Sequence, residues 1–134
     1  MRLWDYRLLK VLPDKFIIAQ WRECIAIKRQ WEKGTLKHRL VSYVIKYTRE
    51  YFLEYVKQVV CELDKRNIKY QEKYYQEIDA FCWEDEMCFH PCYYPEHNQR
   101  YLMQCYYNLE EKYDRGIITF DELQKIREVF DDEI

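Results

Sequence analysis

The sequence predicts an all-α protein, a compact bundle of three main helices with a short fourth helix at the C-terminus. The 134 residues include only 2 Gly and 3 Pro. That is too few for a β-sandwich or barrel, which needs a turn signal every ~8–12 residues. Apolar residues make up 49% of the chain and recur mainly at helical spacing. This length is typical of one domain, so we expect residues 1–134 to form a single helical domain.

The first helix is expected to begin at Pro13-Asp14 and to end at Gly34. Proline suits a first helical turn, where its missing N–H costs nothing, and an acidic residue suits the positive end of the helix dipole. Glycine readily adopts the left-handed backbone that ends helices. Between these signals the apolar residues follow a helical period, at positions 16, 17, 21, 24, 25, 27 and 31.

A second helix is expected to start near Thr35–Lys37 and to run to Asp64 or Lys65, with Asn67 as its stop. Its apolar stripe consists of Leu40, Val44, Tyr47, Tyr51, Val56, Val59, Val60 and Leu63. Residues 68–94 are expected to be irregular, because this stretch is interrupted by proline at its C-terminal end.

The third helix is expected over residues 95–113, with Pro95 in its first turn and Gly116 after its end. The segment from Thr119 to Glu122 has the spacing of a capping box. In that motif the threonine hydroxyl and the glutamate carboxylate accept hydrogen bonds from each other's free backbone N–H groups. A short last helix should therefore start there and end near Phe130.

Charge is unevenly distributed along the chain. Residues 1–73 contain 17 Lys+Arg against 9 Asp+Glu, whereas residues 74–134 contain 5 against 15. A basic half is typical of a surface that binds a polyanion, since each neutralised phosphate releases a counterion. The same pattern is expected if the two halves simply pack against each other, and the sequence leaves both interpretations open.

The chain has six cysteines, but its first residues lack the apolar segment of a signal peptide. No apolar run reaches the 18 residues that a membrane-spanning helix needs. We therefore expect a cytoplasmic protein without membrane contact, with reduced thiols.

Glu23 is the residue of the first helix best suited to chemistry. At ~3.6 residues per turn it lies over Phe16, Gln20 and Ile27, at the edge of the apolar stripe. A carboxylate in such a place can carry protons in acid–base catalysis. An ordinary ion pair with Arg22 or with another arginine of the helix is the alternative, and periodicity alone favours it.

Three segments of the chain resemble the pyrimidine-dimer DNA glycosylases. The first includes the aromatic-Arg-Glu run at residues 21–23, which lies at the same distance from the start of the chain as in that family. The others resemble the family's second and third helices, and the order of the segments is the same. The residues that carry the resemblance are Leu12, Asp14, Ala19, Trp21-Arg22-Glu23, Val41-Ser42-Tyr43-Val44, Asn67-Ile68, Tyr94-Pro95-Glu96-His97 and Leu109-Glu110-Glu111-Lys112.

The resemblance implies a bifunctional DNA glycosylase and AP lyase that needs no cofactor and no metal. In that family the N-terminal α-amine attacks the sugar C1′, the damaged base leaves, and the imine that remains permits β-elimination of the strand. The residue matching Glu23 holds the sugar and moves protons, and the residue matching Arg22 contacts DNA. An α-amine suits this role because its ordinary pKa, near ~8, leaves more of it neutral at pH 7 than of a lysine.

The chain differs from the family pattern near this site. The family nucleophile is a threonine exposed by removal of the initiator methionine, whereas Arg2 is bulky and normally leaves Met1 in place. The predicted catalytic residues are therefore Met1, Arg2 and Glu23. Phe16 and Ala26 replace a family histidine and arginine, and acidic residues 131–134 replace an aromatic tail.

Cationic and aromatic residues in and after the first helix form the predicted DNA surface. Cations position phosphates, and aromatic rings can stack on an extruded base. The predicted contacts are Arg22, Lys28, Arg29, Lys37, His38, Arg39 and Trp21. A solvated loop between two helices would have a similar composition, so this alternative stays open. The expected partner is damaged or abasic double-stranded DNA.

A second cluster of potential ligands comprises Cys82, Cys88, His90, Cys92, His97 and Cys105. Their spacing includes no standard zinc knuckle, so free thiols are the preferred interpretation and metal binding an alternative. His97 is expected in the active-site wall if the third helix packs across Glu23. Besides the repair enzyme, two alternatives remain: a non-catalytic helical module that binds nucleic acid or protein, and a Cys/His metal-binding protein.

Overall fold

The computed structural model describes residues 1–83 and 92–134 and confirms the all-α prediction. No strand occurs within these two ranges. The elements are the 3-10 helices η1 (Tyr6–Val11) and η2 (Ser42–Lys46) and the α-helices α1 (Asp14–Lys33), α2 (Arg49–Lys65), α3 (Glu72–Cys82), α4 (Gln99–Asp114) and α5 (Phe120–Glu133). No helix of the described ranges is long and apolar enough to cross a membrane.

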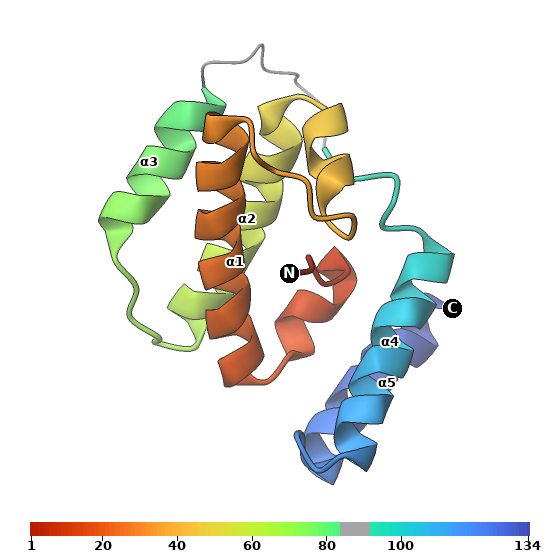
Figure 1. Cartoon of the computed structure of the whole chain (residues 1–134). Coiled ribbons are helices and arrows are strands. Elements are labelled where there is room, and N and C mark those ends of the chain that lie inside the picture. Colours follow the sequence, from red (N-terminus) through yellow and green to blue (C-terminus); the bar gives the residue numbers. More distant parts are fainter. Residues whose placement is uncertain (84–91) are drawn as a thin grey trace.

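The helices form two packed groups joined by η1 (Figure 1). Helices α1 and α2 pack against each other, and α3 packs on both of them. Helices α4 and α5 form an antiparallel pair, and η1 connects the groups by packing on α2 and on α5. The N-terminus consequently lies near the middle of the molecule, between α1 and the α4–α5 pair (Figure 1).

One hydrophobic core joins all seven elements. Burial of such side chains is worth roughly 25 cal/mol per Å² of apolar surface and drives the packing. The core includes side chains from every helix, among them Leu8, Ile17, Ile27, Val44, Phe52, Val56, Leu63, Ile78, Leu102, Leu109, Leu123 and Ile126.

Helix α1 has the predicted limits. It begins at Asp14 after Pro13, and it ends where Gly34 takes a left-handed backbone with φ of 71°. The apolar stripe faces α2 with Ile17, Cys24 and Ile27 fully buried, which leaves the opposite face of the helix to solvent.

The predicted start of the second helix is wrong. Residues 35–41 form a loop, η2 follows, and α2 begins only at Arg49. The segment contains β-branched Val41, Val44 and Ile45, which disfavour a helix. A short 3-10 turn buries Val41, Tyr43 and Val44, whereas Leu40 stays 40% exposed. Near the other end the prediction holds, since α2 ends at Lys65 and Asn67 adopts a positive φ.

The prediction that residues 68–94 are irregular is also wrong for Glu72–Cys82, which form α3. Ile78, Phe81 and Cys82 are buried at helical spacing, and Tyr74 and Tyr75 pack against the core one turn earlier. Two of these five residues are tyrosines, whose polar hydroxyls hid the helical period in the sequence.

The C-terminal helices follow the prediction with shifted limits. Helix α4 starts four residues later than expected, because the side chain of Asn98 accepts a hydrogen bond from the Tyr101 amide and caps the helix. The capping box of α5 is confirmed in both directions between Thr119 and Glu122, at 3.1 and 2.8 Å. Helix α5 continues past Phe130 to Glu133.

Candidate functional site

The first four residues form a segment without regular secondary structure, and its backbone is bound by side chains. Gln20 of α1 donates from Nε2 to the Arg2 carbonyl at 2.9 Å and accepts at Oε1 from the Trp4 amide at 2.8 Å. The Tyr55 hydroxyl of α2 donates to the Trp4 carbonyl at 2.6 Å. The Tyr101 hydroxyl of α4 donates to the Leu3 carbonyl. Three helices therefore hold the chain just beyond its terminal amine.

The next residue fixes the other end of this segment. Asp5 is fully buried, caps η1 by accepting from the Arg7 amide, and forms an ion pair with the Arg7 guanidinium at 2.9 Å. A buried carboxylate needs such a partner, because an unpaired charge in the interior is costly. These contacts of Asp5 fix the end of the N-terminal segment that adjoins η1.

Met1 and Glu23 line the same surface pocket, which has a volume of about 270 Å³. The N-terminal segment forms one wall, α1 a second and α4 the third. The lining side chains are Met1, Arg2, Trp4, Ala19, Gln20, Glu23, Asn108 and Lys112. A larger hollow of about 530 Å³ lies where η1 meets α1, but none of the predicted site residues lines it.

Glu23 lines this pocket, and its carboxylate has an acceptor atom without a partner. Its Oε2 atom is buried, and no described residue gives it a hydrogen bond. No ion pair in the described ranges joins it to Arg22 or Arg29, so the structure contradicts the ion-pair alternative. Its neighbour Cys24 is fully buried, and burial raises the pKa of that thiol, with the Glu23 charge adding to the effect. Cys24 is consequently a packing residue rather than a nucleophile.

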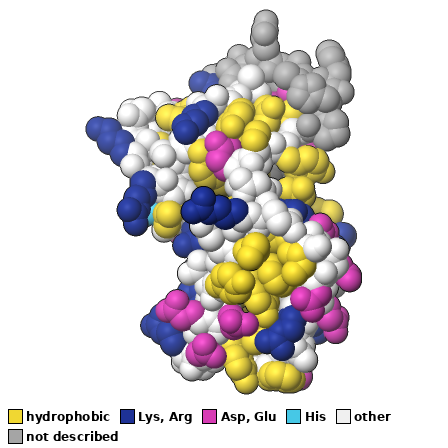
Figure 2. Space-filling model, turned by 90° about the vertical axis from the view of Figure 1, so that its right-hand side faces the viewer, with side chains coloured by type: hydrophobic (Ala, Val, Ile, Leu, Met, Phe, Trp, Pro, Cys, Tyr) yellow, Lys and Arg dark blue, Asp and Glu magenta, His cyan; other side chains and the backbone are white. Residues whose placement is uncertain are grey.

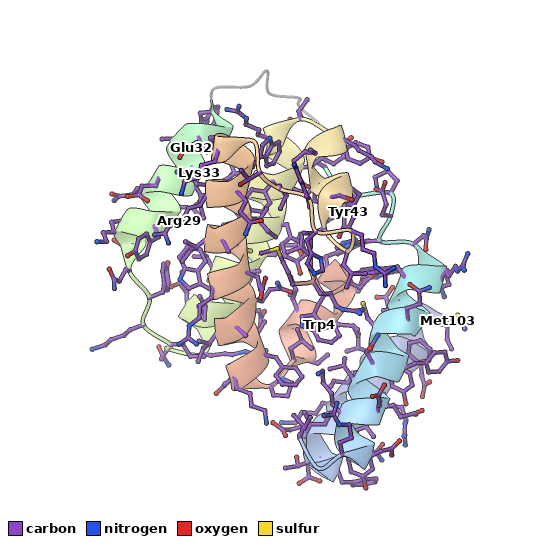
Figure 3. All side chains as sticks on the ribbon, viewed as in Figure 1. Trp4, Arg29, Glu32, Lys33, Tyr43 and Met103 are labelled. Atoms are coloured by element: carbon purple, nitrogen blue, oxygen red, sulfur yellow. The ribbon has the colours of Figure 1, made fainter. Side chains whose placement is uncertain are left out.

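Cations and aromatic rings lie close together at the pocket: Arg2, Trp4 and Lys112 line it, and Phe16 stacks on Trp4. The Arg2 guanidinium lies 5.6 Å from the centre of the Trp4 ring, and Trp4 is parallel to Phe16 with ring centres 6.1 Å apart. The Lys112 ammonium lies 5.8 Å from the Phe16 ring. Figure 3 shows Trp4 beside α1, on the side that faces the α4–α5 pair. The wall thus offers positive charge and flat apolar surface, the two features that a nucleotide contacts.

His97 does not line the pocket with Glu23, which corrects its expected place in the active-site wall. It is buried behind the N-terminal segment among tyrosines, stacked on Tyr101 with ring centres 4.9 Å apart. Its Nε2 atom lies 2.6 Å from the Tyr43 hydroxyl. Burial lowers the pKa of His97 to about 4, although the Asp5 charge opposes this shift. His97 is therefore neutral at pH 7 and belongs to the support of the segment.

Five of the predicted DNA contacts are exposed. Arg22 and Arg29 lie on the outer face of α1, and the others follow one another in the loop before η2; these are Lys37, His38 and Arg39. In Figure 2 most of the cationic side chains lie on the upper part of the molecule, whereas acidic side chains gather on the lower part, which α4 and α5 form. Charge is therefore separated in space as well as along the sequence.

Two of the predicted DNA contacts are withdrawn from solvent. Trp21 is only 6% exposed and packs edge-on against Tyr70, with ring centres 5.5 Å apart, so its ring cannot meet a base. Lys28 pairs with Glu32 at 3.1 Å and lies 5.8 Å from the Phe81 ring, with a side chain only 11% exposed. Position 21 belongs to the buried stripe of α1, and position 28 lies beside it, toward α3.

The Cys/His cluster has no support as a metal centre in the described ranges, where no three potential ligands gather. Cys82, Cys92 and Cys105 are buried. Burial raises the pKa of Cys105 to about 11, so it stays protonated at pH 7. Cys88 and His90 lie outside the described residues.

A family comparison agrees with this geometry. A model of the pyrimidine dimer DNA glycosylases matches residues 1–76, more than half of the chain. The chain belongs to the pyrimidine dimer DNA glycosylase family. The match covers the N-terminal segment, α1, η2 and α2, and hence both Met1 and Glu23. Searches among curated proteins and among solved structures found no match.

Family membership supports a role in DNA repair as a pyrimidine dimer DNA glycosylase, with DNA as the substrate. Within this glycosylase, α4 adds Asn108 and Lys112 to the pocket from outside the matched range. Sequence reasoning missed both residues, and it also missed Gln20. The one signal that could have singled out Gln20 is that it is a polar residue one turn before Glu23, among the buried positions of α1.

Proposed function

We propose that the protein is a bifunctional DNA glycosylase and AP lyase, with the Met1 α-amine as nucleophile and Glu23 as the catalytic carboxylate. The observation that carries this proposal is the shared pocket, in which the start of the chain and the free carboxylate face one space of about 270 Å³. An amine nucleophile and a proton-transfer group must both be within reach of one sugar carbon. That Met1 and Glu23 line the same pocket supports this arrangement.

The reaction begins with attack of the neutral Met1 amine on C1′ of the deoxyribose. The new N–C1′ bond replaces the bond to the base, which leaves with its electron pair and is protonated. The nitrogen loses a proton, the C1′–O4′ bond breaks with protonation of O4′, and an imine forms. Removal of a C2′ proton then expels the 3′ phosphate by β-elimination. Water hydrolyses the imine and releases the amine.

Glu23 has two tasks in this scheme. It stabilises the positive charge that develops on the sugar as the base leaves, and it removes protons from the nitrogen and from C2′. The buried Oε2 atom without a partner supports both, since a free acceptor in a partly dry site interacts strongly with a cation. Arg2 and Lys112 supply cations for the flanking phosphates from the same pocket.

The proposed substrate is double-stranded DNA with a damaged base or an abasic site. The exposed cations on α1 and on the loop before η2 would hold its backbone, and Trp4 offers a flat surface at the pocket wall. We leave Trp21 and Lys28 out of this surface because both are withdrawn from solvent.

Borohydride trapping tests the mechanism. A duplex with one abasic site, incubated with the protein and sodium borohydride at low salt, should yield a covalent complex. Glu23→Gln should lower the rate of strand cleavage by about 10²–10⁴-fold, the typical contribution of an acid–base group. Glu32→Gln, an exposed change on the same helix, is the matched control and should cleave at the wild-type rate.

The absence of any covalent complex, from protein whose intact mass shows a free α-amine, would contradict the proposal. Salt-sensitive DNA binding without cleavage would then identify a non-catalytic module on this fold.

A further inference from the structure

The pocket explains where Met1 lies but not what keeps its amine there. A chain terminus is usually poorly ordered unless other residues tie it down. In this protein each carbonyl of residues 2, 3 and 4 accepts a hydrogen bond from a side chain, and the side chains come from three helices. Terminal disorder would spread the amine over many positions and lower its effective concentration at a sugar carbon.

We propose that Gln20, Tyr55 and Tyr101 are positioning residues that set the reach of the Met1 amine, an inference that rests on the proposed function. They act through the backbone of residues 2–4 and not by contact with the reacting atoms. We call these three side chains the N-terminal clamp.

Gln20 is the centre of the clamp. Its side-chain amide presents the oxygen to the Trp4 N–H and the nitrogen to the Arg2 carbonyl. The opposite orientation would place nitrogen against N–H and oxygen against C=O, so the contacts fix the orientation of the amide. Gln20 is only 1% exposed, which leaves its hydrogen bonds without competition from water.

The two tyrosines complete the clamp from opposite sides. The Tyr55 hydroxyl lies 2.6 Å from the Trp4 carbonyl and 3.1 Å from Gln20 Oε1, so it supports both the segment and the glutamine. Burial raises the pKa of Tyr55 and of Tyr101 above that of free tyrosine. Both hydroxyls consequently keep the proton that they donate, at any pH where the protein works.

The first anchored carbonyl is that of Arg2, so the backbone of only two residues separates it from the amine. Since two residues span at most ~7 Å, the amine can sample only a limited volume in front of Glu23. A displacement of ~1 Å in a reacting group can cost about 10²-fold in rate. Loss of the clamp should thus slow imine formation far more than it weakens DNA binding, because the exposed cations of α1 and of the loop before η2 are unchanged.

Gln20→Met tests this inference, because it keeps the length of the side chain and removes both of its hydrogen bonds. The readouts are the single-turnover rate of borohydride trapping at saturating abasic DNA and the Kd for a duplex with a tetrahydrofuran abasic analogue. We expect the trapping rate to fall by about 10–100-fold and the Kd to stay within about twofold of wild type. Tyr55→Phe, which removes one hydroxyl and nothing else, should lower the rate by a smaller factor and again leave Kd unchanged.

Ile78→Val is the control for a general loss of stability. It removes a methyl group from a buried position on α3, which does not line the pocket. The inference is overturned if Gln20→Met and Tyr55→Phe trap as fast as wild type, or if Ile78→Val slows trapping equally. Should Gln20→Met fail to fold, Tyr55→Phe decides alone. Wild-type protein that traps no DNA would instead refute the proposed function, so the two failures are distinguishable.

Discussion

The buried histidine behind the N-terminal segment makes stability depend on pH in a specific window. His97 is held neutral, with its pKa lowered to about 4 chiefly by burial. In the unfolded chain its pKa returns to the ordinary value near ~6.5. Between these values the unfolded state binds a proton that the folded state does not. The stability that His97 contributes is therefore complete above pH ~6.5 and is lost as the pH falls toward 4.

The size of the effect follows from the two pKa values. Their separation of ~2.5 units corresponds to about 3 kcal/mol in the free energy of unfolding once the pH has fallen below both. By pH 5 the loss should already be about 2 kcal/mol relative to pH 7. The groups that face the ring do not remove this dependence, because the Asp5 charge is paired with Arg7 and Tyr43 keeps its proton.

Urea unfolding at a series of pH values, followed by circular dichroism, measures the effect. Carboxylates also titrate in this range, so the comparison is with His97→Gln, which retains a polar side chain that does not titrate. The variant will be less stable at pH 7, because stacking on Tyr101 is lost. However, its free energy of unfolding should fall by about 2 kcal/mol less than that of wild type between pH 7 and 5. Parallel pH curves for the two proteins would refute the reasoning.

Three further predictions concern the DNA surface, the last helix and the position of the amine. Arg22→Ala should weaken DNA binding uniformly across sequences and reduce the slope of log K against log salt by about 1, as measured by fluorescence anisotropy. Thr119→Ala should lower the free energy of unfolding in urea by about 1 kcal/mol, because it removes the α5 capping box. One glycine added before Met1 should lower the borohydride-trapping rate by about 10²-fold and leave the affinity for DNA unchanged. The clamp still binds the backbone of residues 2–4, so the added residue moves the α-amine away from its place near Glu23. An unchanged salt slope, urea midpoint or trapping rate would contradict the respective prediction.

The sequence was sufficient for features that depend on local chemistry. Pro13 and Gly34 limit α1 as expected, and the Thr119 capping box is present with both hydrogen bonds. Features that depend on tertiary contacts were predicted less well. The helical stripe around Val44 is interrupted because a 3-10 turn buries that segment better, and α3 was missed because tyrosines make up part of its buried face.

In the candidate site, too, some residues could be predicted from the sequence and others depend on tertiary contacts. Glu23 and Met1 were predicted from their resemblance to a family, and the structure places both at one pocket. The clamp was not predictable, because Gln20, Tyr55 and Tyr101 are far apart in the sequence and each contacts backbone atoms, which carry no sequence signal. Trp21 differs from these residues, because the aromatic-Arg-Glu run suggests a DNA contact there, whereas the helical period of α1 buries its side chain.

The most direct test of the central claim is to identify which amine carries the sugar. Protein trapped by borohydride on abasic DNA can be digested with nuclease and protease, and the modified peptide sequenced by mass spectrometry. The account predicts that the reduced adduct lies on the α-amine of Met1 and that Glu23→Gln slows its formation. An adduct on a lysine such as Lys112, with an unmodified terminus, would contradict the account.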